Sequence, residues 1–264
     1  MEDSAPVFDD RVSEGDLETP RRKPRAVAAS ILYRFTSAAA PVLGRRRLLS
    51  WYLNLSRCFH RLSFEIAGEI YGESFHLKRL AVTGSLIRRF LPENGSVLDV
   101  GCGTGRWSRV ASEHAGSVVG IDFSATNIET ARRLHPSPNI EFVVGDVAQA
   151  LPESAGPAFD LALLIHVLEH IDDAVDLLSR LRRLARTVVV EVPDFEADML
   201  NHVRRSLGRA FYSDSDHVRE YTESILRDQL GRAGLSVLLL ENRRGSILAV
   251  ATGESDQARE ASVL

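Results

Sequence analysis

The sequence predicts an α/β protein built on a doubly wound parallel sheet that ends in an antiparallel hairpin. Three observations predict this fold class. Short apolar runs alternate with helical patterns from Val97 onward, in units of roughly 20–25 residues. The run Phe159–Ile165 is almost wholly apolar, as expected of a strand buried on both faces. The last two apolar runs, Leu235–Leu240 and Ser246–Ala251, are separated by a short turn that ends in Gly245.

The individual elements follow from the same patterns. Strands are predicted at Val97–Val100, Val118–Ile121, Ile140–Val144, Phe159–Ile165 and Thr187–Val192. Helices are predicted at Gly105–His114, Ala125–Leu134, Asp172–Ala185 and Thr222–Ala233. Ser124 and Thr222 are the expected N-caps, because a side-chain oxygen can accept a hydrogen bond from an otherwise unpaired N–H group of the first turn. These elements give five parallel strands plus the terminal hairpin, over residues 93–253.

The N-terminal third is predicted to be helical and separate from the sheet. Residues 1–25 are expected to form a disordered tail, because they are mainly polar and begin acid-rich. Residues 26–92 are expected to form a helical extension or lid, and residues 254–264 a flexible tail. Within the extension, the pattern predicts a helix interrupted near Pro41 and another helix that leads into the first strand.

The cluster Arg45–Arg47, followed by several apolar residues, predicts a solvated basic face on packed helices. A lid over an acceptor site and a peripheral contact with anionic lipid or phosphate are the alternatives.

The composition favours a soluble protein of the reducing cytoplasm. Hydrophobic residues make up 44% of the 264 residues, charged residues 26%, and the formal net charge is −4. The balance is weakly acidic and gives no overall attraction to nucleic acid. Cys58 and Cys102 are too few for a disulfide framework. No apolar run approaches the ~20 residues that span a bilayer.

A glycine loop follows the first strand, in the sequence V-L-D-V-G-C-G-T-G at 97–105. A dinucleotide fingerprint would carry another glycine where Arg106 stands, and a phosphate-binding P-loop would continue with lysine and a hydroxyl residue. Asp122 ends the second strand, where a carboxylate can accept from both ribose hydroxyls. Asp146 follows the third strand, where it can accept from an adenine amino group. The predicted ligand is therefore a nucleoside with a short polar tail and no phosphates.

Four motifs in order resemble the class I S-adenosylmethionine-dependent methyltransferases. They are V-L-D-V-G-C-G-T-G, V-V-G-I-D-F-S, F-V-V-G-D-V and F-D-L-A-L-L-I-H-V-L-E-H, and the resemblance covers about residues 80–252. It implies a Rossmann-like fold and methylation of a small-molecule acceptor, most readily at a hydroxyl oxygen. It also implies S-adenosylmethionine contacts by Asp99, Gly101, Cys102, Gly103, Gly105, Asp122, Phe123, Asp146, Val147 and His166.

The motif H-V-L-E-H at 166–170 holds the candidate catalytic residues. An inverted zinc-protease motif has the same spacing but belongs on a helix, whereas this one follows a strand, so that interpretation is rejected. The motif also resembles methyltransferases of small-RNA 3′-ends and of ubiquinone precursors, in which an acid-x-x-Glu-His segment and a later histidine hold a divalent ion. By that resemblance the ligands are His166, Glu169, His170 and His217, with His166 where those families have glutamate.

Three interpretations of this set stay open. Three imidazoles and one carboxylate suit zinc, manganese or iron better than magnesium. Alternatively, His166, His170 or His217 acts directly as acid or base, since histidine titrates near neutral pH. The set can also be purely structural.

Three other functions compete with a small-molecule methyltransferase. An RNA 3′-end 2′-O-methyltransferase is favoured by the metal-like set and the N-terminal arginines and disfavoured by the net charge. A non-catalytic partner would bind the cofactor without turning over an acceptor. A nicotinamide oxidoreductase is opposed by Arg106.

Overall fold

The computed structural model describes residues 27–146, 157–208 and 216–253, and the chain divides into two compact units. The helical unit contains the chain up to Ala81 together with a segment that begins at Leu200. The sheet unit contains Val82–Met199 and the C-terminal part of the chain. The predicted tails at 1–25 and 254–264 lie outside the described residues.

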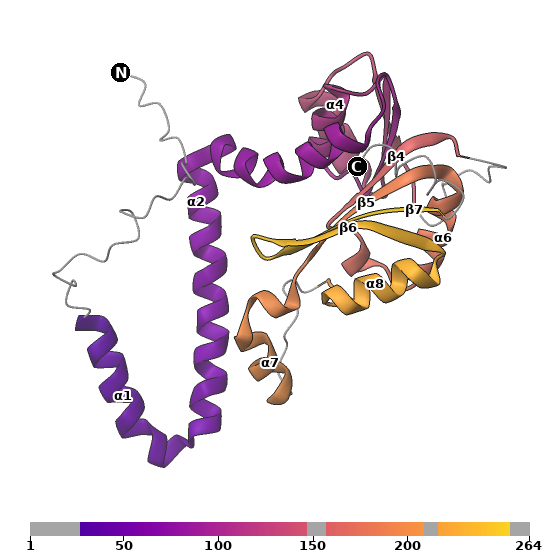
Figure 1. The fold of residues 1–264 in the computed structure, drawn as a ribbon. Coiled ribbons are helices and arrows are strands. Elements are labelled where there is room, and N and C mark those ends of the chain that lie inside the picture. The colour runs from indigo at the N-terminus through magenta and orange to yellow at the C-terminus, as the bar shows by residue number, and fades with distance from the viewer. Residues whose placement is uncertain (1–26, 147–156, 209–215, 254–264) are drawn as a thin grey trace, which may run out of the picture. The chain divides into compact units, whose positions relative to one another are not determined.

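The helical unit is built on two long helices (Figure 1). Helix α1 spans Val27–Leu43, and α2 begins at Arg45 and ends at Phe90, after passing into the sheet unit. Gly44 between them has a φ of 80°, a conformation that glycine adopts without strain. Helix α7, Met199–Ser206, lies almost wholly in this unit. Among the described residues, no helix is both long and apolar enough to cross a membrane.

The prediction of a separate helix leading into the first strand was wrong, because α2 is continuous over 46 residues. The stretch between Ile66 and His76 contains Gly68 and Gly72 but no proline. A glycine inside a helix costs only about 1 kcal/mol relative to alanine, so two of them do not end it.

The sheet unit has seven strands in the order β3-β2-β1-β4-β5-β7-β6 (Figure 1). The strands are β1 Ser96–Val100, β2 Ser117–Asp122, β3 Ile140–Val144, β4 Phe159–Ile165, β5 Ala185–Pro193, β6 Leu235–Arg243 and β7 Ser246–Gly253. The helices and short 3-10 turns are α3 Arg106–Ser112, α4 Ala125–Leu134, η2 Leu168–His170, α6 Ala174–Leu184, η3 Phe195–Ala197 and α8 Glu223–Arg232. Strands β1 to β5 pair in parallel, and β7 runs antiparallel to both β5 and β6. The predicted fold class is confirmed.

Local chemistry sets the ends of several elements where they were predicted. The side chain of Ser124 accepts from the backbone N–H of Asn127 at the start of α4, and Thr222 accepts from Ile225 at the start of α8. The final hairpin turns at Arg244 and Gly245, which have φ values of 52° and 82°. Two successive residues with positive φ give the tight turn that matches the twist of a hairpin.

Alternating residues of the central strands build two cores, one on each face of the sheet. On one face Leu98, Ala162 and Val188 pack in a cluster with buried residues of α6 and α8. On the other face Val97 and Leu161 pack in a cluster with the C-terminal end of α2 and with α3. This period of two is what a strand covered on both faces requires.

The parallel order brings the ends of distant chain segments together. The carboxyl ends of parallel strands share one edge of a sheet, and the strand order reverses between β1 and β4. Ligands of open α/β sheets bind in the crevice at such a reversal. The glycine loop after β1 and the H-V-L-E-H segment after β4 therefore meet at the expected binding edge.

Candidate active site

The glycine loop after β1 uses left-handed backbone at three alternate positions. Gly101, Gly103 and Gly105 have φ values of 67°, 54° and 81°. A Cβ on Gly101 would lie 2.8 Å from Val167, and a Cβ on Gly105 would lie 2.7 Å from Phe142, whereas nothing lies within 4 Å of that position on Gly103. Gly101 and Gly105 are thus required by the protein's own packing. Gly103 leaves open space, which is what close approach of a ligand to the backbone needs.

Asp122 ties this loop to the end of β2. Its Oδ2 accepts from the backbone N–H of Gly103 at 2.8 Å, and its Oδ1 accepts from the backbone N–H of Ser124 at 2.9 Å and from the Asn127 amide at 3.3 Å. The side chain is buried. A carboxylate offers about four acceptor positions, so one position on Oδ2 remains for a ligand hydroxyl.

Asp99 lies buried in β1, directly below the loop, and its Oδ2 accepts from the Ser108 hydroxyl at 2.6 Å. Burial raises the pKa of Asp99 from 3.8 to about 7; the nearby Asp122 raises it further, while the hydrogen bonds from Ser108 lower it. The carboxyl group therefore changes its charge near neutral pH. A ligand that places a cation beside it would favour the ionised form.

This raised pKa predicts a pH-dependent penalty on folding. Between pH 4 and 7 the folded chain keeps a proton on Asp99 that the unfolded chain has lost, so the contribution of this group to stability falls as pH rises through that window. Asp99→Asn cannot ionise at this position. We therefore expect its free energy of unfolding, relative to that of wild type, to rise by about 2 kcal/mol between pH 5 and pH 8. Urea unfolding of both proteins at the two pH values measures this gain. Any effect of the amide itself on stability does not depend on pH. A free-energy difference between variant and wild type that is the same at pH 5 and pH 8 would therefore contradict the prediction.

The remaining predicted cofactor residues differ in exposure. Burial, together with the charges of Asp99 and Asp122, raises the pKa of the Cys102 thiol far above its usual range, so the thiol stays protonated. The Phe123 side chain is 81% exposed and Asp146 is also exposed, next to the ends of β2 and β3. Val147 lies outside the described residues.

His166 begins the segment after β4 and sits between two buried carboxylates. It has a φ of 58°, unusual for a residue with a side chain, and its backbone N–H donates to the Glu191 carbonyl oxygen. Its Nδ1 lies 3.1 Å from Glu169 Oε1, and its Nε2 lies 3.4 Å from Glu191 Oε1. Thr83 donates from its hydroxyl to Glu191 Oε2 at 2.7 Å. A neutral imidazole has one N–H, so satisfying both carboxylates requires an additional proton on the ring or on one of the acids.

Glu191 and Thr83 are site residues that the sequence did not predict. The available signal was Glu191 itself, an acidic residue inside the otherwise apolar strand V-V-V-E-V. A buried charge is costly unless it is paired, so its position predicts a partner but does not identify one. Thr83 lies 108 positions earlier in the chain and carries no local signal.

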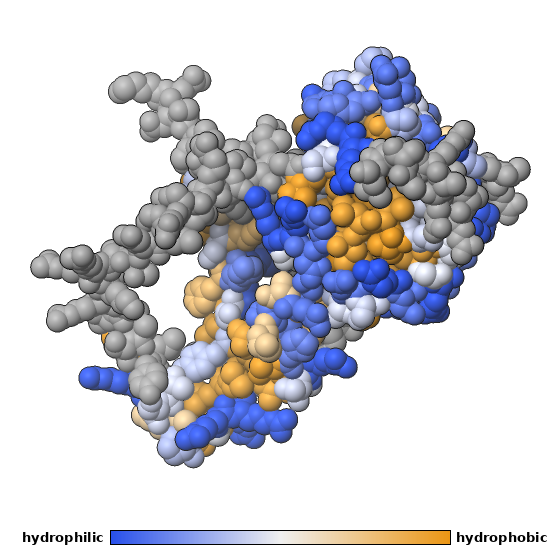
Figure 2. Space-filling model, in the orientation of Figure 1, coloured by the Kyte–Doolittle hydropathy of each residue, from blue (hydrophilic) through white to orange (hydrophobic). Residues whose placement is uncertain are grey.

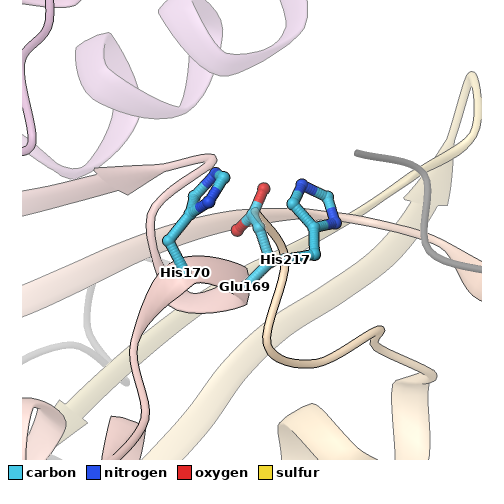
Figure 3. A group of neighbouring side chains, drawn as sticks. All are labelled: Glu169, His170 and His217. Atoms are coloured by element: carbon cyan, nitrogen blue, oxygen red, sulfur yellow. The ribbon is translucent and has the colours of Figure 1, made fainter. Parts of the chain in front are cut away.

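Glu169, His170 and His217 form a cluster of donor atoms (Figure 3). One ligand atom of each lies within 4.8 Å of those of the other two, and Figure 3 shows the Glu169 carboxylate beside both imidazole rings. The rings of His170 and His217 meet edge to face, with centroids 4.7 Å apart. His166 is not part of this group, although it contacts Glu169 from the other side.

Glu169 carries one carboxylate oxygen with an unmet hydrogen-bonding capacity. The side chain is 1% exposed, and its Oε1 is bonded to His166. Among the described residues, no group donates to the buried Oε2. Such an atom is rare in folded proteins, and it points to a missing proton donor or cation.

Backbone contacts hold His217 beside Glu169. The backbone N–H groups of Val218 and Arg219 both donate to the Glu169 carbonyl oxygen, at 2.9 and 3.3 Å. The Nδ1 of His217 lies 3.0 Å from Glu220 Oε1, which fixes the orientation of the ring. A carboxylate in this position is the usual second partner of a metal-binding or catalytic histidine.

Tyr221, at the end of the same segment, is fully buried. Its hydroxyl donates to Gln229 Oε1 at 2.9 Å and lies 3.3 Å from the Leu168 carbonyl oxygen. Burial raises the pKa of this hydroxyl to about 12. Tyr221 therefore supports the η2 turn from the core and does not titrate at neutral pH.

Comparison with known proteins agrees with the predicted fold and family. Residues 75–240 match the family model described as "Methyltransferase domain". The ubiquinone biosynthesis O-methyltransferase of Chelativorans sp. is 30% identical over 177 residues, which cover 63% of this chain and 68% of that protein. The O-antigen chain terminator bifunctional methyltransferase/kinase WbdD of Escherichia coli is 34% identical over 106 residues, or 37% of this chain. The chain spans only 15% of WbdD.

A solved structure shows the same architecture. Magnesium protoporphyrin IX methyltransferase from Synechocystis PCC 6803, crystallised with bound SAH, aligns with a TM-score of 0.53 and 22% identity. The alignment covers 68% of this chain and 84% of that one. At this identity the likeness concerns the fold.

Proposed function

Because this chain belongs to the S-adenosylmethionine-dependent methyltransferases, we propose that it methylates a small-molecule acceptor at a hydroxyl oxygen. The observation that carries the proposal is the buried Glu169 carboxylate, which is grouped with ring nitrogens of His170 and His217 and whose Oε2 has no donor among the described residues. A hydroxyl must lose its proton when its oxygen is methylated, and a base nearby accepts it. The relative from Chelativorans sp. is an O-methyltransferase, which supports the same acceptor atom.

In this proposal the glycine loop holds the cofactor. The open backbone at Gly103 accommodates its body, and Asp99 faces the cationic amino group of its methionine end. The remaining acceptor position of Asp122 takes a ribose hydroxyl. The exposed ring of Phe123 covers the adenine, and Asp146 accepts from the adenine amino group.

The other members of the predicted cofactor set contribute backbone and packing. Gly101 and Gly105 keep the loop close to the strands, and the thiol of Cys102 fills space beside it. Val147 stays a predicted contact of the adenine. His166, with its left-handed backbone, stays a predicted contact of the cofactor.

The reaction is an in-line displacement at the methyl carbon. The acceptor oxygen forms a bond to that carbon as the carbon–sulfur bond breaks, and the bonding electrons stay on sulfur, which becomes a neutral thioether. The hydroxyl proton passes to Glu169 or to the imidazole of His170 or His217. Because the displacement needs alignment more than acid–base strength, much of the rate comes from holding the two substrates in register.

The geometry disfavours His166 as the proton acceptor. Both of its ring nitrogens face carboxylate oxygens of Glu169 and Glu191. Neither nitrogen is therefore in position to accept a proton from a substrate. We assign His166 the task of pairing with two buried acids and orienting Glu169. His170 and His217 are the better catalytic candidates.

A divalent cation is a second candidate for activating the hydroxyl. Glu169, His170 and His217 would hold it, and the donor set of one carboxylate and two imidazoles fits zinc, manganese or iron. The unpartnered Oε2 of Glu169 fits a cation, and Glu220 supplies the outer partner of His217. When bound, such an ion would lower the pKa of a coordinated hydroxyl.

Transfer of a labelled methyl group to matched acceptors tests the proposal. The panel contains a catechol, a simple phenol, a benzoate, an aniline and a short RNA with a free 3′-terminal ribose. We expect label on the phenolic oxygens, with loss of activity in His217→Ala and in His170→Ala. Label on the aniline alone, or on the RNA alone, would contradict the proposal. Cofactor binding with no labelled product from any acceptor would support a non-catalytic partner.

Metal dependence is read from the same assay after treatment with a chelator. Activity that disappears and returns with Mn²⁺ or Zn²⁺ would support the ion. Activity unchanged by the chelator, in a sample without metal by elemental analysis, would support direct proton transfer.

A further inference from the structure

The N-terminal helices carry a strongly one-sided charge. Between Thr19 and Phe64 the sequence contains ten lysine and arginine residues and no acidic residue. The rest of the chain has 22 basic and 36 acidic residues, so the weakly acidic total conceals a basic segment. Six of the ten are arginines in α1 and α2: Arg34, Arg45, Arg46, Arg47, Arg57 and Arg61.

The same helices expose an apolar stripe. In α2 the side chains of Phe59, Leu62, Ile66 and Ile70 are 64%, 51%, 52% and 48% exposed. Their spacing of three and four residues places them on one face of the helix. With 3.6 residues per turn, Arg57 and Arg61 lie on the opposite side.

A second exposed group surrounds the turn between α1 and α2. Val42 is 83% exposed and Leu43 46%, and directly after them come Arg45–Arg47, all exposed. Trp51 follows one turn later and is 50% exposed. Figure 2 shows hydrophobic surface beside hydrophilic surface over this helical unit.

We propose that the helical unit docks on an anionic lipid bilayer, with the apolar stripe of α2 and the α1–α2 turn in the interface. Helices that lie in a membrane surface combine large apolar side chains on one face with arginine or lysine on the other. Since no described helix is long and apolar enough to cross a membrane, the contact is peripheral.

The charge and the apolar groups together select the bilayer over other occupants. A second copy of the chain would set the ten basic residues of its own α1 and α2 against ten here, with only three acids in these helices, Glu65, Glu69 and Glu73, to offset the repulsion. A nucleic acid would pair with the arginines but would leave Phe59, Leu62 and Ile66 in water. An anionic bilayer satisfies both, because headgroups pair with the exposed Arg45–Arg47 at the turn and acyl chains receive the apolar side chains.

Vesicle co-sedimentation of the full chain tests the proposal. The probes are vesicles of phosphatidylcholine alone and of phosphatidylcholine mixed with phosphatidylserine. We expect binding to the mixed vesicles only, and a loss of roughly 100-fold in R45Q/R46Q/R47Q. The matched control, R133Q/R183Q/R227Q, removes the same charge from exposed positions of the sheet unit and should bind like wild type.

A second variant separates insertion from simple charge attraction. F59S/L62S/I66S changes only exposed side chains, so it should fold normally by circular dichroism, and we expect it to lose the binding that persists at high salt. Equal binding to both kinds of vesicle would overturn the proposal. So would self-association or RNA binding by a chain that binds neither vesicle. Methyl transfer to a soluble acceptor is measured separately, so a failure here leaves the proposed reaction standing.

Discussion

Replacing Asp122 with alanine is expected to weaken binding of the demethylated cofactor by about 100-fold. The substitution removes the proposed ribose acceptor and also the acceptor for the backbone N–H groups of Gly103 and Ser124. A hydrogen bond to a charged group contributes about 1.5–3 kcal/mol, so losing the one proposed ribose bond, together with the tether of the loop at Gly103, would reach this magnitude. Isothermal titration calorimetry of the purified variant measures the dissociation constant.

Two comparisons make that measurement specific. Asp146→Ala removes an exposed carboxylate at the end of the next strand and should weaken binding by about tenfold. Asp122→Asn keeps an oxygen acceptor for Gly103 and should keep the loop in place, so it isolates the ligand's share of the loss. An Asp122→Ala protein that binds the cofactor within threefold of wild type would refute the ribose assignment.

The Glu169→Gln variant is expected to lower kcat by about 1,000-fold and to leave cofactor affinity within threefold. The amide has nearly the shape of the carboxylate but can neither take up a proton nor hold a cation by charge. Positioned acid–base groups contribute about 10²- to 10⁴-fold to rate. Single-turnover methyl transfer under saturating cofactor measures the change.

A neighbouring carboxylate supplies the control for that result. Glu220→Gln keeps the cluster intact but weakens the partner of His217 Nδ1, so we expect only a 10- to 100-fold loss. If Glu169 merely satisfied His166, the Gln variant would unfold at a lower temperature while kcat stayed within fivefold of wild type. That outcome would remove Glu169 from the reaction.

The strands and caps could be predicted because their signals are local. The run Ile140–Val144 is apolar except for Glu141 and has the length of a strand, and Ser124 and Thr222 stand where an extended segment gives way to a helical pattern. The continuity of the helix from Arg45 to Phe90 could not be predicted, because Gly68 and Gly72 weaken the helical pattern and the packing around them is unknown from sequence. Elements whose ends are set by neighbouring residues could be predicted, whereas an element whose continuity depends on packing against distant residues could not.

The candidate site was predictable only in part, for the same reason. His166, Glu169 and His170 lie within one short motif, and His217 was added by resemblance. The direction of the His166 ring depends on Glu191, which belongs to the next strand of the sheet, and on the left-handed backbone at His166 itself. Neither feature has a signature in the residues next to His166. A sequence pattern can bring candidate groups together, but it cannot say which side of an imidazole faces the protein.

The two cysteines differ strongly in solvent exposure, so the wild-type chain already offers one selective attachment site for a thiol-reactive label. Cys102 is buried with a raised pKa, whereas Cys58 is exposed on α2, directly before Phe59. Maleimide reagents react with the thiolate, so a nitroxide or fluorophore would label Cys58 and spare the cofactor loop. Its spectrum would then report the polarity around α2 in the native sequence, without any engineered residue.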